Sequence, residues 1–195
     1  MEADWEIEVG GGAPVIEALW SGFVDLRKHP ERIAEIAEAA AFPALAGLLT
    51  ALNGTDSPVW TAKCDIWEPE AAGLAGPCAV DELAQSALAC YVDLLPRADE
   101  VFGQWKQAEA FCQEWVARLA AVWLPGCSVE LIVRQAIAGE AEGFGVTAYL
   151  SGTGRDQSAA ATALAAALVA FAGAISTAAA PKTAVSKLQL RSTGE

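Results

Sequence analysis

Large hydrophobic side chains recur most regularly in the segment from Asp156 to Ala180. Four bulky residues follow one another there at intervals of four, three and four, and most residues between them are alanine. They are Leu164, Leu168, Phe171 and Ile175. This spacing places all four on one face of a helix, and it predicts a long core helix with Asp156 as its N-cap. The preceding Gly152-Thr153-Gly154 is predicted to be a turn.

The same segment raises the alternative of a membrane span, because no charged residue lies between Asp156 and Lys182. A stretch of about 20 apolar residues suffices to cross a bilayer. A lipid-facing helix carries bulky side chains all round, whereas here they form a single stripe among alanines. The pattern therefore favours a core helix that packs on a sheet, and we expect no membrane partner.

Alternation of polar and hydrophobic residues marks the predicted strands. The sequence EADWEIEV near the N-terminus alternates, and Gly10-Gly11-Gly12 ends it. A second extended segment runs from Val15 to Leu26, with a break near Ser21-Gly22. We expect these two segments to form a hairpin or to lie side by side.

Three further strands follow later in the chain. Val59 to Trp67 is rich in β-branched and aromatic residues and is bounded by prolines. The segments Ser128 to Ile137 and Phe144 to Leu150 alternate strongly and flank the sequence AGEAEG. They predict a β-hairpin.

Hydrophobic residues at intervals of three and four predict three more helices. The first begins at His29-Pro30, because proline suits the first turn of a helix, and ends at Asn53-Gly54. Pro43 lies inside this run and should kink or split it. The second helix is predicted from Asp81 to Leu95 and the third from Ala98 to Leu124.

The elements run in the order ββα-β-αα-ββα, which predicts an α+β fold. We expect an antiparallel sheet of about five strands with helices packed on one face. Gly22-Phe23 and Gly143-Phe144 each precede an alanine-rich helix, so a pseudo-duplication of a ββα unit is an open alternative. The 195 residues suit one domain, predicted at 1–182, with a flexible tail at 183–195.

Charge narrows the classes of partner. Twelve basic residues against 25 acidic ones give a formal net charge of −13. This balance disfavours nucleic acid and anionic membranes, which require lysine and arginine to neutralise phosphates. It is compatible with a basic protein partner or a cationic ligand, and also with a charge that only keeps the protein soluble.

The cysteines and the N-terminus indicate a reducing compartment. The five cysteines are odd in number and form no C-x-x-C pair, which is typical of reduced core cysteines. The N-terminus has no basic segment followed by a continuous apolar run, so no secretory signal is predicted. We expect a cytoplasmic protein.

Catalytic and metal-binding patterns are weak in this sequence. His29 is the only histidine, and its place beside a proline suits a surface or capping role. Cys64 adjoins Lys63, but neighbouring strand residues point to opposite faces, so the lysine is poorly placed to activate the thiol. We therefore predict no catalytic residue, no metal ligand and no cofactor, and we lean against an enzyme.

Seven tryptophans are many for this length, and some are hard to bury together. Tryptophan is favoured both in cores and at protein interfaces. The candidate pocket or interface residues are four tryptophans and four carboxylates: Trp20, Trp60, Trp67, Trp123, Glu6, Glu8, Asp65 and Glu68. The first hypothesis is a non-enzymatic acidic protein that acts through contacts with a basic partner or through self-association. The alternative is a small-ligand-binding protein or an enzyme, with a Trp-lined pocket in which carboxylates are the functional groups.

Overall fold

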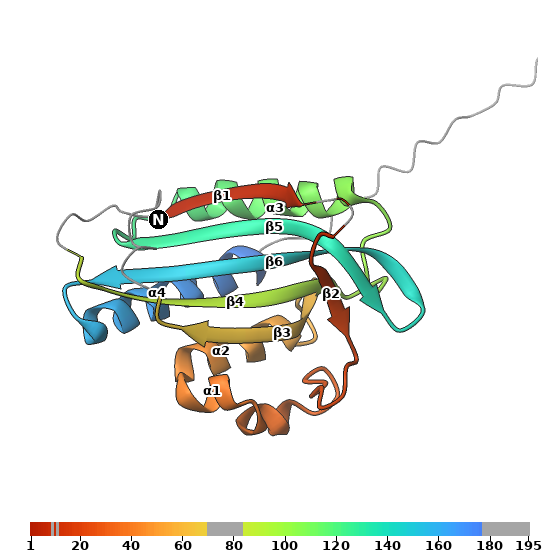
Figure 1. Cartoon of the computed structure of the whole chain (residues 1–195), viewed down its shortest axis with the longest axis horizontal. Helices are drawn as coiled ribbons and strands as arrows, with labels where there is room; N and C mark the ends of the chain where they lie inside the picture. The colour runs from red at the N-terminus through yellow and green to blue at the C-terminus, as the bar shows by residue number, and fades with distance from the viewer. Residues whose placement is uncertain (9, 11, 70–83, 177–195) are drawn as a thin grey trace, which may run out of the picture.

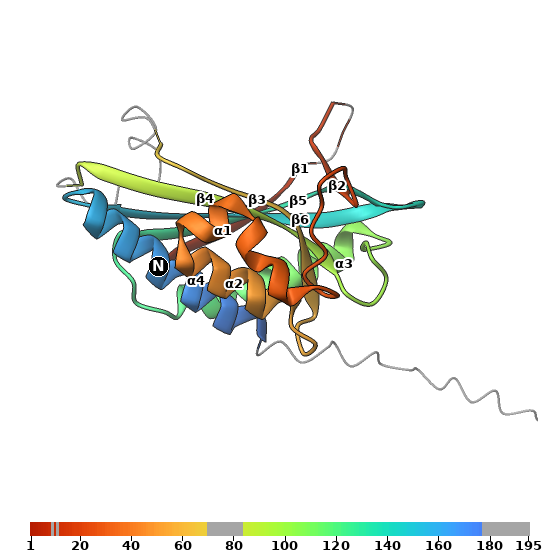
Figure 2. The same cartoon turned by 90° about the horizontal axis from the view of Figure 1, so that it is seen from below.

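A computed structural model describes residues 1–8, 10, 12–69 and 84–176. In it a six-stranded sheet carries helices on one face (Figures 1 and 2). The strands are β1 (Glu2–Glu8), β2 (Val15–Ala18), β3 (Val59–Trp67), β4 (Ser86–Pro96), β5 (Cys127–Ala138) and β6 (Ala141–Gly154). The helices are the 3₁₀ helix η1 (Pro30–Glu35), α1 (Ala37–Ala41), α2 (Pro43–Asn53), α3 (Trp105–Ala120) and α4 (Gln157–Ser176). The fold is α+β, as the element pattern predicts.

The sheet is mixed, although most of its pairings are antiparallel. Its strand order is β1-β5-β6-β4-β3, and β2 also pairs with β5. Both β1 and β2 run parallel to β5, where β1 faces Ser128 to Arg134 and β2 faces Gln135 to Ala138. The predicted hairpin or side-by-side pairing of these two strands is therefore wrong. The glycine run separates two strand segments that follow one another along the same edge.

The predicted helix from Asp81 to Leu95 is wrong over its described part, which forms the strand β4 between β6 and the edge strand β3 (Figure 1). Residues 81–83 lie outside the described residues. Cys90, Val92 and Leu94 of this strand enter the helix-side core, while Leu95 enters a small core on the other side. A strand buried on both faces has a nearly continuous hydrophobic sequence, which also satisfies a helical spacing.

The helix predicted from Ala98 to Leu124 is shorter than expected, and the structure has it as α3 (Trp105–Ala120). One of the residues before it pairs with the sheet instead. Phe102 forms an isolated antiparallel bridge with Phe144, and both of its backbone hydrogen bonds are made there. The helix α3 starts after Gln104, whose side chain forms a reciprocal capping box with Gln107.

Several local predictions are confirmed. The strand β3 has the predicted bounds, the hairpin β5-β6 forms, and Pro43 begins a separate helix, α2. The hairpin turn is tighter than expected, because Ala138 pairs with Ala141 across Gly139 and Glu140. Gly139 has a φ of +65°, a conformation that glycine adopts without strain.

The helix α4 is a core helix, and its stripe packs on the sheet. Leu164, Leu168, Phe171 and Ile175 are each 0 to 1% exposed. Asp156 is the N-cap, since its Oδ1 accepts a hydrogen bond from the Ala159 N–H at 2.8 Å. By length and composition alone α4 could cross a membrane, but its bulky face is covered by strands and helices.

The turn predicted at residues 152–154 is wrong, because β6 continues to Gly154. A Cβ atom on Gly152 would lie 2.2 Å from the backbone N of Leu164. Glycine is required here because the sheet and α4 approach each other closely.

The two predicted ββα units differ in architecture. The first two strands lie along one edge of β5, whereas β5 and β6 form a hairpin. The pseudo-duplication therefore gains no support and stays a prediction, as does the domain range 1–182. The predicted tail at 183–195 lies outside the described residues.

Candidate functional site

One face of the sheet is left without helices, and we call it the open face. Figure 2 shows α1 to α4 together on the opposite side. Val129, Leu131 and Val133 of β5 point to the helix side and belong to the main core. The residues that alternate with them therefore point to the open face.

Strand pairing arranges the open-face residues in four transverse rows. The first row is Glu2, Ser128, Ser151, Ala89 and Trp67. The second row is Asp4, Glu130, Tyr149, Tyr91 and Asp65. The third row is Glu6, Ile132, Thr147 and Asp93, and the fourth is Glu8, Arg134 and Gly145.

The first row forms the floor of a groove, because its three central residues are small. The groove has a volume of about 700 Å³, and its lining includes Trp67, Tyr149, Asp4 and Glu130. Aromatic rings and carboxylates thus enclose the same space. Such a mixture of apolar surface with a few charged groups is typical of a recognition site.

Three aromatic rings from β3, β4 and β6 meet beside this groove. The ring centroids of Trp67 and Tyr91 are 6.3 Å apart, those of Trp67 and Tyr149 are also 6.3 Å apart, and those of the two tyrosines are 6.0 Å apart. We call these three rings the aromatic triad. They are the side chains of the only two tyrosines in the chain and of a tryptophan that is 37% exposed.

The carboxylates at the acidic end of the second row form no ion pair with a described side chain. No lysine, arginine or histidine of the described ranges lies within 4.0 Å of the carboxylates of Asp4, Glu6 or Glu130, the distance that defines an ion pair. Partial burial raises the pKa of Glu130, and the neighbouring charges of Glu6 and Asp4 raise it further, while the charge of Arg134 opposes the shift. A cation bound here would relieve this repulsion.

A polar network crosses the third and fourth rows. Arg134 Nε donates to Glu8 at 2.9 Å and its Nη1 donates to the Tyr149 hydroxyl at 3.1 Å. The Thr147 hydroxyl donates to Asp93 Oδ1 at 2.6 Å. Burial raises the pKa of Asp93, although Thr147, Lys63 and Arg134 oppose the shift. The network ties four strands together and positions the Tyr149 ring.

Both edges of the sheet have backbone groups capped by side chains. Asp4 accepts a hydrogen bond from the Trp5 N–H on β1 at 2.8 Å, and Asp65 accepts one from the Ile66 N–H on β3 at 2.7 Å. The Trp20 indole donates to the Ala62 carbonyl of β3 at 3.3 Å. Capped edges are poor templates for an added strand, so the face is better suited to recognition than the edges.

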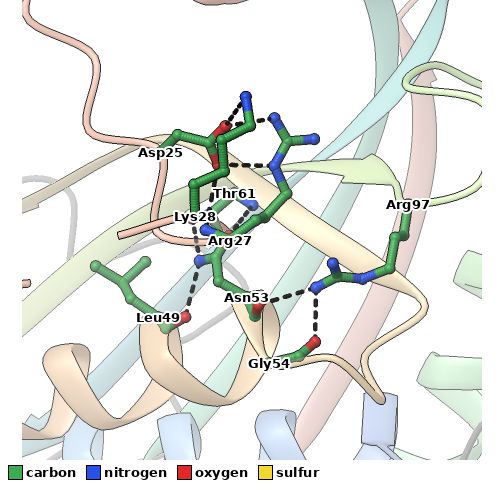
Figure 3. Close-up of polar contacts among 8 residues, drawn as sticks. All are labelled: Asp25, Arg27, Lys28, Leu49, Asn53, Gly54, Thr61 and Arg97. Atoms are coloured by element: carbon green, nitrogen blue, oxygen red, sulfur yellow. Dashed lines mark hydrogen bonds and ion pairs between the residues drawn. The ribbon is translucent and has the colours of Figure 1, made fainter. Parts of the chain in front are cut away.

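A second cavity, of about 400 Å³, lies at the β3 edge and is lined by residues that include Trp20, Phe23, Lys63 and Tyr91. Figure 3 shows polar contacts of the segment 25–28 and of α2 with their neighbours at this edge. Asp25 pairs with Arg27 and Lys28, and these partners lower the pKa of Asp25 to about 2. We call this space the Trp20 cavity.

The helix α2 is tied to the same edge by two polar side chains. Asn53 Nδ2 donates to the Leu49 carbonyl at 2.8 Å and to the Thr61 hydroxyl at 2.7 Å. Arg97 donates to the carbonyls of Asn53 and Gly54 (Figure 3). These bonds satisfy the end of α2 and hold the bulged part of β3, so their role is structural.

The eight predicted residues fall into several places. Trp67, Asp65, Glu6 and Glu8 share the open face. The other four lie elsewhere. Trp20 lines the Trp20 cavity, and Trp60 is 1% exposed in the small core, with Arg27 over its ring. Trp123 is 86% exposed and lies near the N-terminus. Glu68 accepts a hydrogen bond from Gln157.

Sequence reasoning missed both tyrosines, Glu130, Arg134 and Asp93. Tyr91 and Asp93 were missed because β4 has the spacing of a helix. Glu130, Arg134 and Tyr149 alternate with hydrophobic residues in β5 and β6. The alternation places these residues on one exposed face of their strands. It does not show which residues of the neighbouring strands lie next to them.

The described residues offer little for catalysis or for metal binding. Burial raises the pKa of the Cys64 thiol to about 12, and the charges of Glu38, Asp65 and Asp93 add to the shift, so the thiolate is scarce at neutral pH. His29 is exposed and lies 3.2 Å from Glu31. Within the described ranges, no three His, Cys, Asp or Glu side chains are placed to hold a metal ion.

Comparison of the chain with protein-family models, with curated proteins and with solved structures gives no match.

Proposed function

We propose that this chain is a non-enzymatic, cytoplasmic binding protein whose open face recognises a basic surface of a protein partner. The observation that carries the proposal is the charge of the four rows, which hold six carboxylates outside the core, the buried Asp93 and a single arginine. The arginine is engaged with Glu8 and Tyr149. A basic surface complements such a face and is steered towards it.

The same charges favour a different molecule as partner over a second copy of the chain. Two open faces packed on each other would bring together the carboxylates of Asp4, Glu6 and Glu130, which have no ion pair within the described residues. Like charges placed face to face cost several kcal/mol. Self-association through this face is therefore the weaker form of the proposal.

Charge reversal on the open face tests the proposal. The double variant Asp4→Lys/Glu130→Lys should weaken binding of a lysine-rich peptide at least tenfold, and binding of the unmodified protein should weaken as salt rises. Isothermal titration calorimetry measures both effects. The matched control is Glu109→Lys/Glu114→Lys on α3, behind the sheet, which changes the net charge equally. Equal losses in the two double variants would show that only net charge matters and would refute the proposal.

A second candidate function, binding of a small ligand, is favoured by the Trp20 cavity. Lys63 lines it and lies within 4.0 Å of no carboxylate among the described residues. An aromatic carboxylate would match this ammonium group beside the rings of Trp20 and Phe23. Two glutamates also line the cavity: Glu35 is paired with Arg32, and Glu38 opposes an anionic ligand. A thermal shift caused by benzoate and lost in Lys63→Met would support this candidate, and no shift at saturating benzoate would count against it.

A further inference from the structure

The aromatic triad has the dimensions of a cation-binding site. Its three centroid distances, between 6.0 and 6.3 Å, form a nearly equilateral triangle. A cation resting over the middle of this triangle would lie within about 6 Å of all three ring centroids, the range in which ring faces attract cations. The rings are inclined to one another by 47 to 84°, so they do not form a flat surface.

The protein itself supplies a cation beside one of these rings. The guanidinium carbon of Arg134 lies 5.5 Å from the centroid of Tyr149. The Tyr149 hydroxyl accepts a hydrogen bond from the same arginine. A second cation at the triad would lie beside this arginine, and the carboxylates of Asp93 and Asp65 act on Tyr91.

This environment distinguishes between kinds of cation. A primary ammonium group has three strong donors and loses three hydrogen bonds to water when it enters a site lined by rings. A methylated ammonium group keeps the charge, is weakly hydrated and presents methyl groups to the rings, which is the chemistry that aromatic cages recognise. The groove over Ser128, Ser151 and Ala89 leaves room for the chain that carries the group.

We propose that Trp67, Tyr91 and Tyr149 bind a methylated ammonium group, carried by a side chain of the basic partner. Asp93 and Asp65 supply negative charge beside Tyr91, and Glu130 and Asp4 line the adjoining groove. This inference rests on the proposed function, because it specifies which chemical group of the partner the open face binds.

Titration with tetramethylammonium chloride, followed by the amide NMR signals of Tyr91 and Tyr149, tests the inference. We expect saturable shifts that ammonium chloride at the same concentration does not produce. Trp67→Leu should weaken the binding about tenfold or more, whereas Trp105→Leu should leave it unchanged. Trp105 is a matched control because it is also 37% exposed but lies on α3, behind the sheet. Asp65→Asn, which keeps an oxygen acceptor at an exposed position, should weaken binding without disturbing the rings.

The outcomes separate this inference from the proposed function. Equal binding of ammonium and tetramethylammonium, or equal losses in the two tryptophan variants, would overturn the aromatic site. A lysine-rich peptide should gain at least threefold in affinity when one lysine is trimethylated. If both peptides bind the open face equally well, the basic-partner function stands and the inference fails. If tetramethylammonium binds at the triad and neither peptide binds, the site stands and the basic-partner function fails.

Discussion

Asp93 is the one charged side chain that is buried among the described residues, at 7% exposure. It lies on β4 and accepts a hydrogen bond from Thr147. Two cations, Lys63 and Arg134, act on it from β3 and β5, yet burial outweighs them and raises its pKa. Its neighbour Tyr91, of the aromatic triad, has its pKa raised to about 12 by burial and by Asp93. The buried charge thus lies next to the proposed site and costs folding free energy.

Replacement of Asp93 by asparagine should stabilise the protein at pH 7, by about 1 kcal/mol. Asparagine keeps the oxygen that accepts from Thr147 and removes the buried charge. Because the folded pKa of Asp93 lies above its ordinary value of 3.8, the folded state holds its proton more tightly than the unfolded state does. The stability of the unmodified protein should therefore fall as the pH rises from about 4 through the folded pKa.

Urea unfolding between pH 4 and pH 8 measures this difference. The advantage of Asp93→Asn should grow as the pH rises across that window and vanish at its acid end. A variant that is less stable than the unmodified protein at pH 7 would show that the ionised carboxylate is held favourably by Lys63 and Arg134.

At the scale of elements, the fold depends on how α4 packs on the sheet. Two adjacent residues of this helix provide a sharp test, because Leu168 is 1% exposed and Val169 is 71% exposed. Leu168→Ala should lower the free energy of unfolding by about 2 to 5 kcal/mol, since it removes buried methyl groups and leaves a cavity. Val169→Ala should change it by less than about 0.5 kcal/mol. Similar effects in the two variants would contradict the packing described for α4.

The elements that sequence reasoning identified correctly have strong local signals. Pro43 breaks the first helical run, Asp156 caps α4, and alternation defines the β5-β6 hairpin. The misassigned β4 lacks such a signal, because a strand covered on both sides needs hydrophobic residues at nearly every position. Its assignment as a helix also hid Tyr91, so the aromatic triad could not be predicted.

The arrangement of the first two strands illustrates a second limit. A glycine run after an alternating strand permits either a reversal or a continuation along the same edge. The choice is set by β5, which is twelve residues long and can pair with both β1 and β2. The length of β5 does not by itself show that two strands pair with it, because pairing between distant segments leaves no pattern in the sequence of either segment.

For the whole molecule, the two sides of the sheet differ in composition. Its helix side holds the main core and supplies stability, while the open face holds three rows with unbalanced carboxylates and one aromatic triad. The net charge of −13 is compatible with simple solubility, but the structure places six of the carboxylates on one surface and buries a seventh, Asp93, beneath it. This concentration of charge, more than the net charge, supports the proposal of a basic partner.

The most direct test of this account is an NMR titration of the isotope-labelled protein with a lysine-rich peptide. We predict saturable amide shifts in β5 and β6 at Ser128 to Arg134 and at Gly145 to Ser151, with no comparable shifts in α2 or α3. Shifts confined to the helices, or an absence of shifts at concentrations that saturate other acidic proteins, would contradict the assignment of the open face as the binding surface.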